Sequence, residues 1–200
     1  MMKIAVIGYS GSGKSTLARR LGQHRNAKVL HLDTVHHLPG WKERDLKSEK
    51  KIVADFLDGH SSWVIDGNYT KLSFERRMRE ADRIILLEFN RISSLFRILK
   101  RYRVYRGRRR PDMAPGCGEK IDGAFLWWIL YAGRTKEKRA EFQAVKKMYP
   151  DKTVVLRNQR QIDRFTERMK KDSALNGFHK IKKLADKTEE SVMNRKKYVK

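Results

Sequence analysis

Residues 8–15 of the chain read Gly8-Tyr9-Ser10-Gly11-Ser12-Gly13-Lys14-Ser15, which satisfies the pattern G-x-x-x-x-G-K-[ST]. The stretch follows an apolar run at residues 3–7 and precedes a helical pattern in which Leu17, Ala18 and Leu21 share one face. A strand before and a helix after are the neighbours that this phosphate-binding loop requires. The sequence therefore predicts a P-loop, and the alternative is a glycine-rich turn that holds no ligand.

Each residue type in this loop has a role in binding phosphate. The glycines let the backbone wrap a phosphate closely, and the N–H groups at the helix start attract its negative charge. We expect Lys14 to reach the β- and γ-phosphates of ATP, and Ser15 to ligate Mg²⁺. The predicted nucleotide-binding residues of the loop are Gly8, Ser10, Gly11, Ser12, Gly13, Lys14, Ser15 and Thr16. A dinucleotide fingerprint is excluded, because Thr16 stands where its third glycine would be.

Five short runs rich in aliphatic or β-branched residues alternate with helical patterns. The runs are residues 3–7, 29–32, 63–65, 83–87 and 153–156. They do not alternate apolar with polar residues, which is typical of strands buried on both faces. The helical patterns carry apolar faces at Ile52, Val53, Phe56 and Leu57, and at Ile92, Leu95, Phe96, Leu99 and Tyr102. This alternation predicts a doubly wound α/β fold with a parallel sheet.

Composition narrows the class of protein. Two hundred residues suit one domain, and the single cysteine, Cys117, excludes an internal disulfide and a CxxC metal site. The longest apolar stretch, residues 125–132, is far short of the roughly 20 residues that span a bilayer. We therefore expect a soluble, cytoplasmic protein without a membrane span.

The positive charge is large and concentrated. The chain has 47 Lys and Arg against 23 Asp and Glu, a net charge of +24. Residues 91–110 hold nine basic residues and no acidic one, and residues 172–200 hold eight basic and four acidic residues, so these two segments supply 9 + 4 = 13 of the excess. Such surfaces attract phosphates, which makes non-specific nucleic acid a candidate partner of the basic surface and tail.

Two carboxylates follow predicted strands at the carboxyl edge of the sheet, where ligands bind in such folds. Asp66 comes after residues 63–65 and is a candidate for holding Mg²⁺ through water; the alternative is an Asx turn with Gly67. Asp33 ends the second strand and is a candidate for orienting an acceptor hydroxyl or taking its proton; the alternative is a helix cap.

Several motifs together resemble the DNA topology modulation proteins (FlaR-type), P-loop kinases related to adenylate kinase. The resemblance covers about residues 2–165. Its motifs are residues 8–15, Leu32-Asp33, Pro39-Gly40-Trp41, residues 65–69, residues 81–85, and the specific run from Tyr105 to Cys117 that contains R-G-R-x-R-P-D-M.

The resemblance implies a nucleoside-monophosphate-kinase-like fold with a five-stranded parallel sheet, an acceptor-binding region after the second strand, and a basic lid that closes over ATP. We expect a kinase-like domain at residues 1–171 with its lid at about 104–122, and the basic segment at residues 172–200, outside the resemblance, to be a separate tail. Arg97 and Arg101 match the R-x-x-x-R spacing that leads into the lid of adenylate kinases. Catalytic roles fall to Lys14, Asp33, Asp66, Arg106, Arg108 and Arg110.

The chain departs from adenylate kinases where they bind the acceptor phosphate. Their Asp-Gly element continues with Pro-Arg, whereas Asp66-Gly67 is followed here by Asn68-Tyr69-Thr70. Residues 33–41 also lack the second acceptor arginine. The resemblance therefore does not extend to the groups that bind AMP.

Three weaker signals have two interpretations each. His36-His37 is a zinc pair or part of a polar acceptor pocket, and the pocket is favoured because no cysteine accompanies the pair. Phe125, Trp127 and Trp128 form the apolar face of a helix that supports the lid, or a platform for stacking a base. Cys117 is structural or a nucleophile, and the absence of a histidine nearby in sequence favours the structural role.

These observations favour an ATP- and Mg²⁺-dependent kinase that transfers the γ-phosphoryl group to a nucleotide or another small acceptor. The rival is an ATP-binding, DNA-associated protein in which ATP acts as a switch, supported by the basic segments. A third interpretation has the basic tail docking on an anionic membrane surface. The acceptor and the oligomeric state stay open.

Overall fold

The computed structural model describes residues 1–106, 112–118 and 121–171. The chain divides into two compact units, Met1–Ile162 and Asp163–Lys200. The predicted lid residues Arg108 and Arg110 and the tail at 172–200 lie outside the described residues. In the part of the chain that is described, every helix is too short or too polar to cross a membrane.

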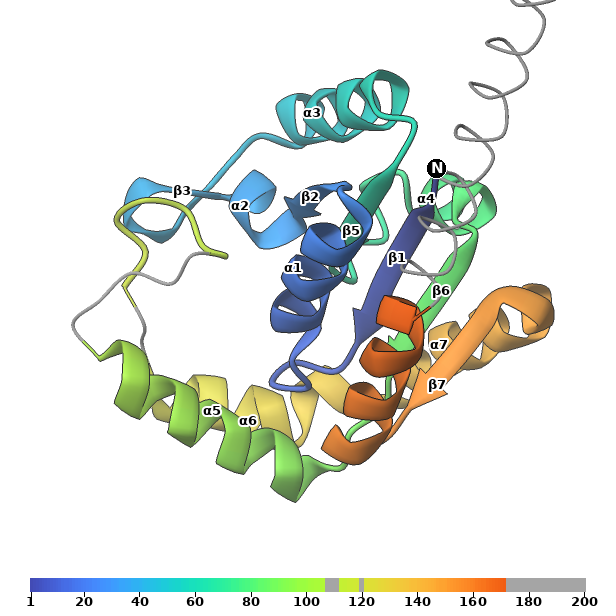
Figure 1. Cartoon of the computed structure of the whole chain (residues 1–200). Helices are drawn as coiled ribbons and strands as arrows, with labels where there is room; N and C mark the ends of the chain where they lie inside the picture. Colours follow the sequence, from blue (N-terminus) through green and yellow to red (C-terminus); the bar gives the residue numbers. More distant parts are fainter. Residues whose placement is uncertain (107–111, 119–120, 172–200) are drawn as a thin grey trace, which may run out of the picture. The chain divides into compact units, whose positions relative to one another are not determined.

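The first unit is built on a five-stranded parallel sheet with the order β2-β5-β1-β6-β7 (Figure 1). Its strands are β1 (Lys3–Gly8), β2 (Lys28–His31), β5 (Trp63–Asp66), β6 (Arg83–Leu87) and β7 (Thr153–Leu156). Each of the five predicted runs forms one of them. The predicted α/β fold of the P-loop, nucleoside-monophosphate-kinase-like type is therefore confirmed.

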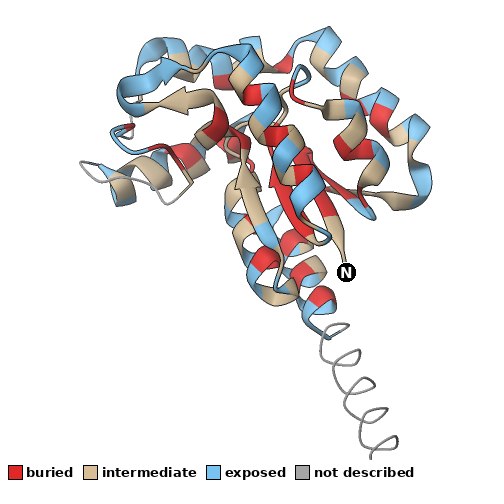
Figure 2. Ribbon diagram, turned by 90° about the horizontal axis from the view of Figure 1, so that it is seen from above, coloured by how far each residue is buried: buried red, intermediate tan, exposed pale blue. Residues whose placement is uncertain are grey.

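Helices cover both faces of this sheet. The labelled helices are α1 (Lys14–Arg25), α2 (Leu32–His36), α3 (Leu46–Gly59), α4 (Phe74–Glu80), α5 (Arg91–Tyr105), α6 (Gly123–Leu130) and α7 (Lys136–Met148), of which α5 and α6 pack against each other. Ala5 and Ile7 of β1 belong to a core with residues of α2, α3, α4 and α7, whereas α1 packs on β1, β2 and β5. The central strands are accordingly buried (red in Figure 2). Short 3-10 turns η1 (Pro39–Trp41), η2 (Ala132–Arg134) and η3 (Pro150–Lys152) complete the unit.

Helix α5 buries a different face from the predicted one. Ile92 and Phe96 of the predicted apolar face are 67% and 66% exposed, whereas Ser94 and Ile98 are fully buried. The cause is the P-loop, which approaches so closely that a Cβ on Gly11 would lie 2.6 Å from Ile98 Cδ1 and 2.8 Å from the carbonyl oxygen of Ser94. The prediction of a buried Ile92–Phe96 face is therefore wrong.

A small antiparallel hairpin, β3 (His37–Leu38) and β4 (Lys42–Glu43), follows α2 and was not predicted. The turn between its strands places Gly40 at φ +76° and Trp41 at φ +65°. Glycine adopts such positive φ values freely, whereas a tryptophan adopts them only at a cost. The hairpin therefore holds Trp41 in a strained backbone, which is typical of a functional position.

Candidate active site

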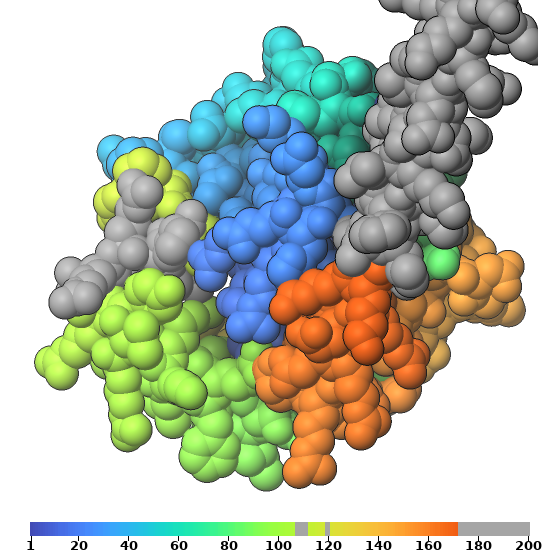
Figure 3. Space-filling view, viewed as in Figure 1, coloured from blue at the N-terminus to red at the C-terminus, as the bar shows by residue number. Residues whose placement is uncertain are grey.

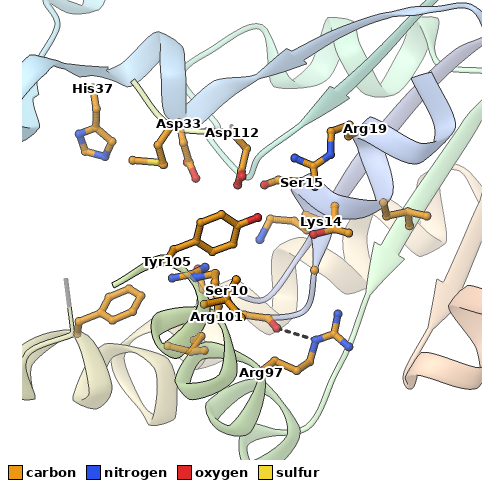
Figure 4. A pocket seen from close by; sticks show the side chains of 18 of the residues that line it. Ser10, Lys14, Ser15, Arg19, Asp33, His37, Arg97, Arg101, Tyr105 and Asp112 are labelled. Carbon is orange, nitrogen blue, oxygen red and sulfur yellow. Dashed lines mark hydrogen bonds between the residues drawn. The ribbon is translucent and has the colours of Figure 1, made fainter. Parts of the chain in front are cut away.

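A cavity of about 1300 Å³ lies between the P-loop, α5 and the segment from α2 to β4 (Figure 4). A typical pocket for one ligand has roughly 300–1,000 Å³, so this cavity has room for two substrates. Figure 3 shows that α5 lies at the surface of the protein beside α1. The predicted residues that line the cavity are Ser10, Gly11, Gly13, Lys14, Ser15, Thr16, Asp33, Arg97 and Arg101.

Other predicted residues lie beneath or beside the cavity. Gly8 and Ser12 are buried and shape the loop, because the Ser12 hydroxyl donates to the Tyr9 carbonyl oxygen at 2.6 Å. Asp66 is buried directly behind Ser15, as described below. Arg106 is exposed at the end of α5 and is not among the lining residues.

Lys14 lies at the centre of the site. Its Nζ donates to the Tyr9 carbonyl oxygen at 3.1 Å, which holds the side chain back over the loop. Burial lowers the pKa of Lys14, and the charges of Asp33 and Asp66 act in the opposite direction. The half-buried ammonium donates to a carbonyl oxygen and faces the cavity, so an anion there would be a favourable additional partner.

Ser15, Asp66 and His31 form a hydrogen-bonded chain beside Lys14. The Ser15 hydroxyl donates to Asp66 Oδ2 at 2.8 Å, and His31 Nδ1 forms a short hydrogen bond with Asp66 Oδ1. Burial lowers the pKa of His31, but the hydrogen bond with Asp66 and the Asp66 charge outweigh it, and the net shift is upward. Hydroxyl and carboxylate oxygens are the ligands that Mg²⁺ prefers, so Ser15 and Asp66 fit the predicted metal site.

Arg97 and Arg101 approach the loop from α5. Arg97 Nε donates to the Gly11 carbonyl oxygen at 3.2 Å, and Nη1 donates to Gln159 Oε1 at 2.6 Å. A Cβ on Gly13 would lie only 2.3 Å from Arg97 Nη2, so the guanidinium rests directly on the loop. Arg101 lines the same cavity as Lys14, and its charge contributes to lowering the pKa of Lys14. The spacing of the two arginines thus brings both to the cavity wall, and Arg97 to the P-loop itself.

Asp33 faces Lys14 from the opposite wall. The chain leaves β2 at His31 and enters α2 at Leu32, so Asp33 lies in the first turn of a helix rather than at the end of the second strand, as was predicted. Tyr69 donates its hydroxyl to Asp33 Oδ1 at 2.9 Å. Burial, together with the charge and hydrogen bond of Asp33, raises the pKa of Tyr69. The protonated tyrosine thereby fixes one carboxylate oxygen of Asp33.

The roles of Asn68 and Arg77 were not predicted from the sequence. Asn68 replaces the expected Pro-Arg element and binds both backbone groups of Gly8, accepting from its N–H at 3.0 Å and donating to its carbonyl oxygen at 2.7 Å. Arg77 is fully buried and donates to the carbonyl oxygens of Leu72, Gly67 and Tyr69. Burial lowers the pKa of Arg77 to about 10. The loop that carries Asn68 and Tyr69 is therefore fixed to the P-loop by hydrogen bonds.

Arg134 was also missed, because a charged residue reads as surface in a sequence. Its guanidinium donates to the carbonyl oxygens of Ile129 at 3.1 Å and Phe89 at 2.8 Å, and to Ser94 Oγ at 2.9 Å. The same group lies 4.0 Å over the Tyr9 ring. Arg134 thus joins the P-loop to α5, α6 and the segment that follows β6, and burial lowers its pKa.

We expect Arg134→Ala to lower the free energy of unfolding by about 3 kcal/mol, because it leaves buried carbonyl oxygens without donors. Urea denaturation measures this. The matched control is Arg139→Ala, at an exposed position of α7, with an expected change below about 0.5 kcal/mol. Equal effects of the two substitutions would contradict the role assigned to Arg134.

The predicted lid is described at residues 112–118, which rest on the β3–β4 hairpin. Asp112 and Met113 line the cavity, and the buried Cys117 donates its thiol to the Leu38 carbonyl oxygen at 3.3 Å. A Cβ on Gly116 would lie 3.3 Å from the Gly40 backbone nitrogen. This segment therefore forms a roof over the α2–β4 side of the cavity.

Helix α6 does not bury its tryptophans. It buries Ile129, whereas Trp127 is 62% and Trp128 43% exposed, so the predicted apolar support face is wrong for these two residues. Phe125 and Trp128 both line the cavity and stack with ring centroids 6.4 Å apart and planes 13° apart. They supply a flat aromatic surface inside the site.

The histidine pair lies in the wall of the cavity. His36 Nδ1 forms a 2.6 Å hydrogen bond with the buried Glu49, and burial, followed by the charge of His36, lowers the pKa of His37. Across residues 1–106, 112–118 and 121–171, no group of three or more His, Cys, Asp or Glu side chains is placed to hold a metal.

Comparison with known proteins gives structural likeness only. No protein-family model and no curated protein matches the chain. Among solved structures it is similar to shikimate kinase from Bacteroides thetaiotaomicron (17% identity, 85% of this chain and 96% of that chain, TM-score 0.48). It is also similar to deoxyadenosine kinase from M. mycoides (16% identity, 84% of this chain and 98% of that chain, TM-score 0.47). A third similar structure is a gluconokinase from Sinorhizobium meliloti (16% identity, 88% of this chain and 97% of that chain, TM-score 0.44). Because the identities and TM-scores are low, these structures do not assign an activity, which has to be inferred from the residues of this chain.

Proposed function

We propose that the protein is an ATP-dependent kinase that transfers the γ-phosphoryl group of ATP to a small acceptor bound in the same cavity. The observation that carries the proposal is the placing of Lys14 and Asp33 on opposite walls of one two-substrate cavity. A cationic phosphate site that faces a carboxylate is the arrangement that phosphoryl transfer to a hydroxyl requires. The resemblance to the FlaR-type proteins supports this assignment.

Each wall has a separate task in this proposal. Lys14, Arg97 and Arg101 bind and orient the phosphates, and their charges stabilise the negative charge of the transition state. Asp33, held by Tyr69, accepts the proton of the acceptor hydroxyl as the bond between the γ-phosphorus and the bridging oxygen breaks and the bond to the acceptor oxygen forms. In this proposal the side chains promote transfer by positioning the two substrates and by stabilising the negative charge of the transition state.

Ser15 and Asp66 are the residues that would hold Mg²⁺. When bound, the ion neutralises phosphate charge and so assists the departure of ADP. His31 keeps the Asp66 carboxylate in one orientation, in the manner of an outer-shell partner.

The proposal is tested by incubating the protein with γ-labelled ATP, Mg²⁺ and a mixture of small metabolites. We expect Mg²⁺-dependent ATP binding and transfer of label to at least one compound, with transfer strongly reduced in Lys14→Ala. A protein that binds no ATP, or that binds it and labels nothing, would contradict the kinase assignment.

The rival function is a DNA-associated protein in which ATP acts as a switch, and the net charge of +24 favours it. The variant in which Arg106, Arg108 and Arg110 are all replaced by Ala separates the two. If the protein is a kinase, this triple variant should lose phosphoryl transfer, while the salt dependence of its binding to duplex DNA should hardly change. We expect that dependence to be shallow and to be removed by truncation after Lys171.

The opposite result would support the rival. Each phosphate contact contributes about 0.9 to the slope of log affinity against log salt. A steep slope that flattens by roughly three in the triple variant, with unaltered ATP turnover, would assign the arginines to DNA.

A further inference from the structure

The two walls of the cavity differ in charge. Every lysine and arginine among its described lining residues belongs to α1 or α5: Lys14, Arg19, Arg20, Arg97, Lys100 and Arg101. The segment from α2 to β4 contributes Asp33, His36, His37, Gly40, Trp41 and Glu43. The acceptor side therefore presents carboxylates and imidazoles.

The side chains of His36 and His37 do not give this wall a net positive charge. His36 is paired with Glu49 at 2.6 Å and lies 3.7 Å from Glu43, so any positive charge it carries is already matched. Burial lowers the pKa of His37 and favours its neutral form. A phosphate or carboxylate of an acceptor bound on this wall would face the carboxylates of Asp33 and Glu43, and the juxtaposition of like charges is unfavourable.

The same wall carries a row of rings. The ring centroids are 5.0 Å apart for Tyr69 and His36, 4.7 Å for His36 and His37, and 5.1 Å for His37 and Trp41. The row ends at Trp41, which is held at φ +65°. A tryptophan held by a strained turn at a cavity wall suits the binding of a flat ring.

We propose that the acceptor is a hydroxyl compound with a planar ring and no phosphate or carboxylate, of the nucleoside or aromatic alcohol class. This inference rests on the proposed kinase function and assigns the substrate class of that site. Trp41 and the histidines bind the ring, and the hydroxyl points to Asp33, which takes its proton when the new phosphorus–oxygen bond forms. Trp41 and Glu43 are then specificity-determining residues.

The experiment uses matched pairs of acceptors with the full chain and Mg-ATP. Each nucleoside is compared with its own monophosphate, and pyridine and benzyl alcohols are compared with the corresponding carboxylates. We expect kcat/KM to be at least tenfold higher for the uncharged member of the productive pairs. Preference for the anionic members, or transfer to a ring-free compound alone, overturns the acceptor class while the kinase assignment stands. If ATP is not bound at all, the proposed function itself fails.

Two sets of variants test the residues. Trp41→Ala should raise the KM of the acceptor about tenfold, as expected from the loss of a stacking ring, with Trp41→Phe restoring most of the affinity. Trp127→Ala, at an exposed position outside the cavity, should leave the KM unchanged. Glu43→Arg should raise the ratio of kcat/KM for monophosphate over nucleoside at least fivefold, and the charge-matched Glu75→Arg on α4 should not. Equal effects of Trp41→Ala and Trp127→Ala, or of the two arginine variants, would overturn the proposal.

Discussion

Lys14→Ala is expected to lower kcat/KM for ATP by about a hundred- to a thousandfold. The substitution deletes the cation that lies between the P-loop and the two carboxylates, and the loss of one preorganised donor to developing charge has an effect of about this size. Because Lys14 lines an open cavity and its backbone is held by α1, the fold should persist, as circular dichroism will show.

The control for Lys14 is Lys28→Ala, which removes an exposed lysine from β2. Its ATP binding, measured by calorimetry, and its turnover should match the parent. A Lys14→Ala protein that binds and turns over ATP like the parent would contradict the central assignment of the site.

Asp33→Asn is expected to lower the rate of phosphoryl transfer by about 10²–10⁴-fold, the usual contribution of a general base. The amide oxygen can still accept the hydrogen bond from Tyr69, so the geometry of the wall is retained while the base is lost. Calorimetry of Mg-ATP binding should show a much smaller change than single-turnover transfer does.

Equal losses of ATP affinity and transfer rate in Asp33→Asn would instead assign Asp33 to nucleotide binding. Asp55→Asn, at an exposed carboxylate of α3 that pairs with Lys51, is the matched control. It should alter neither measurement.

The sequence predicted the sheet well because its signal is local. Strands buried between two layers of helices need unbroken apolar runs, and each of the five runs formed a strand. The P-loop was equally clear, since its glycines, lysine and serine are fixed by contact with one kind of ligand. A structural feature that depends on one short segment can be predicted from a single sequence.

The parts that depend on distant contacts could not be predicted. Helix α5 was assigned the wrong buried face, because its orientation is set by Gly11, far away in sequence, and not by its own apolar periodicity. The pairing of Asp33 with Tyr69 and the burial of Arg134 likewise join segments that nothing in the sequence relates. The β3–β4 hairpin has strands of two residues, too short to leave a periodic pattern.

The contact between residues 112–118 and the β3–β4 hairpin has a consequence for substrate order. Cys117 and Gly116 lie against Leu38 and Gly40, so an acceptor that steadies the hairpin also steadies the roof. If bound ATP also contacts residues 112–118, thermodynamic linkage requires each substrate to raise the affinity of the other by the same factor. Water is too small to hold the hairpin, so we expect it to be a poor acceptor and ATP to be spared from hydrolysis until the true acceptor arrives.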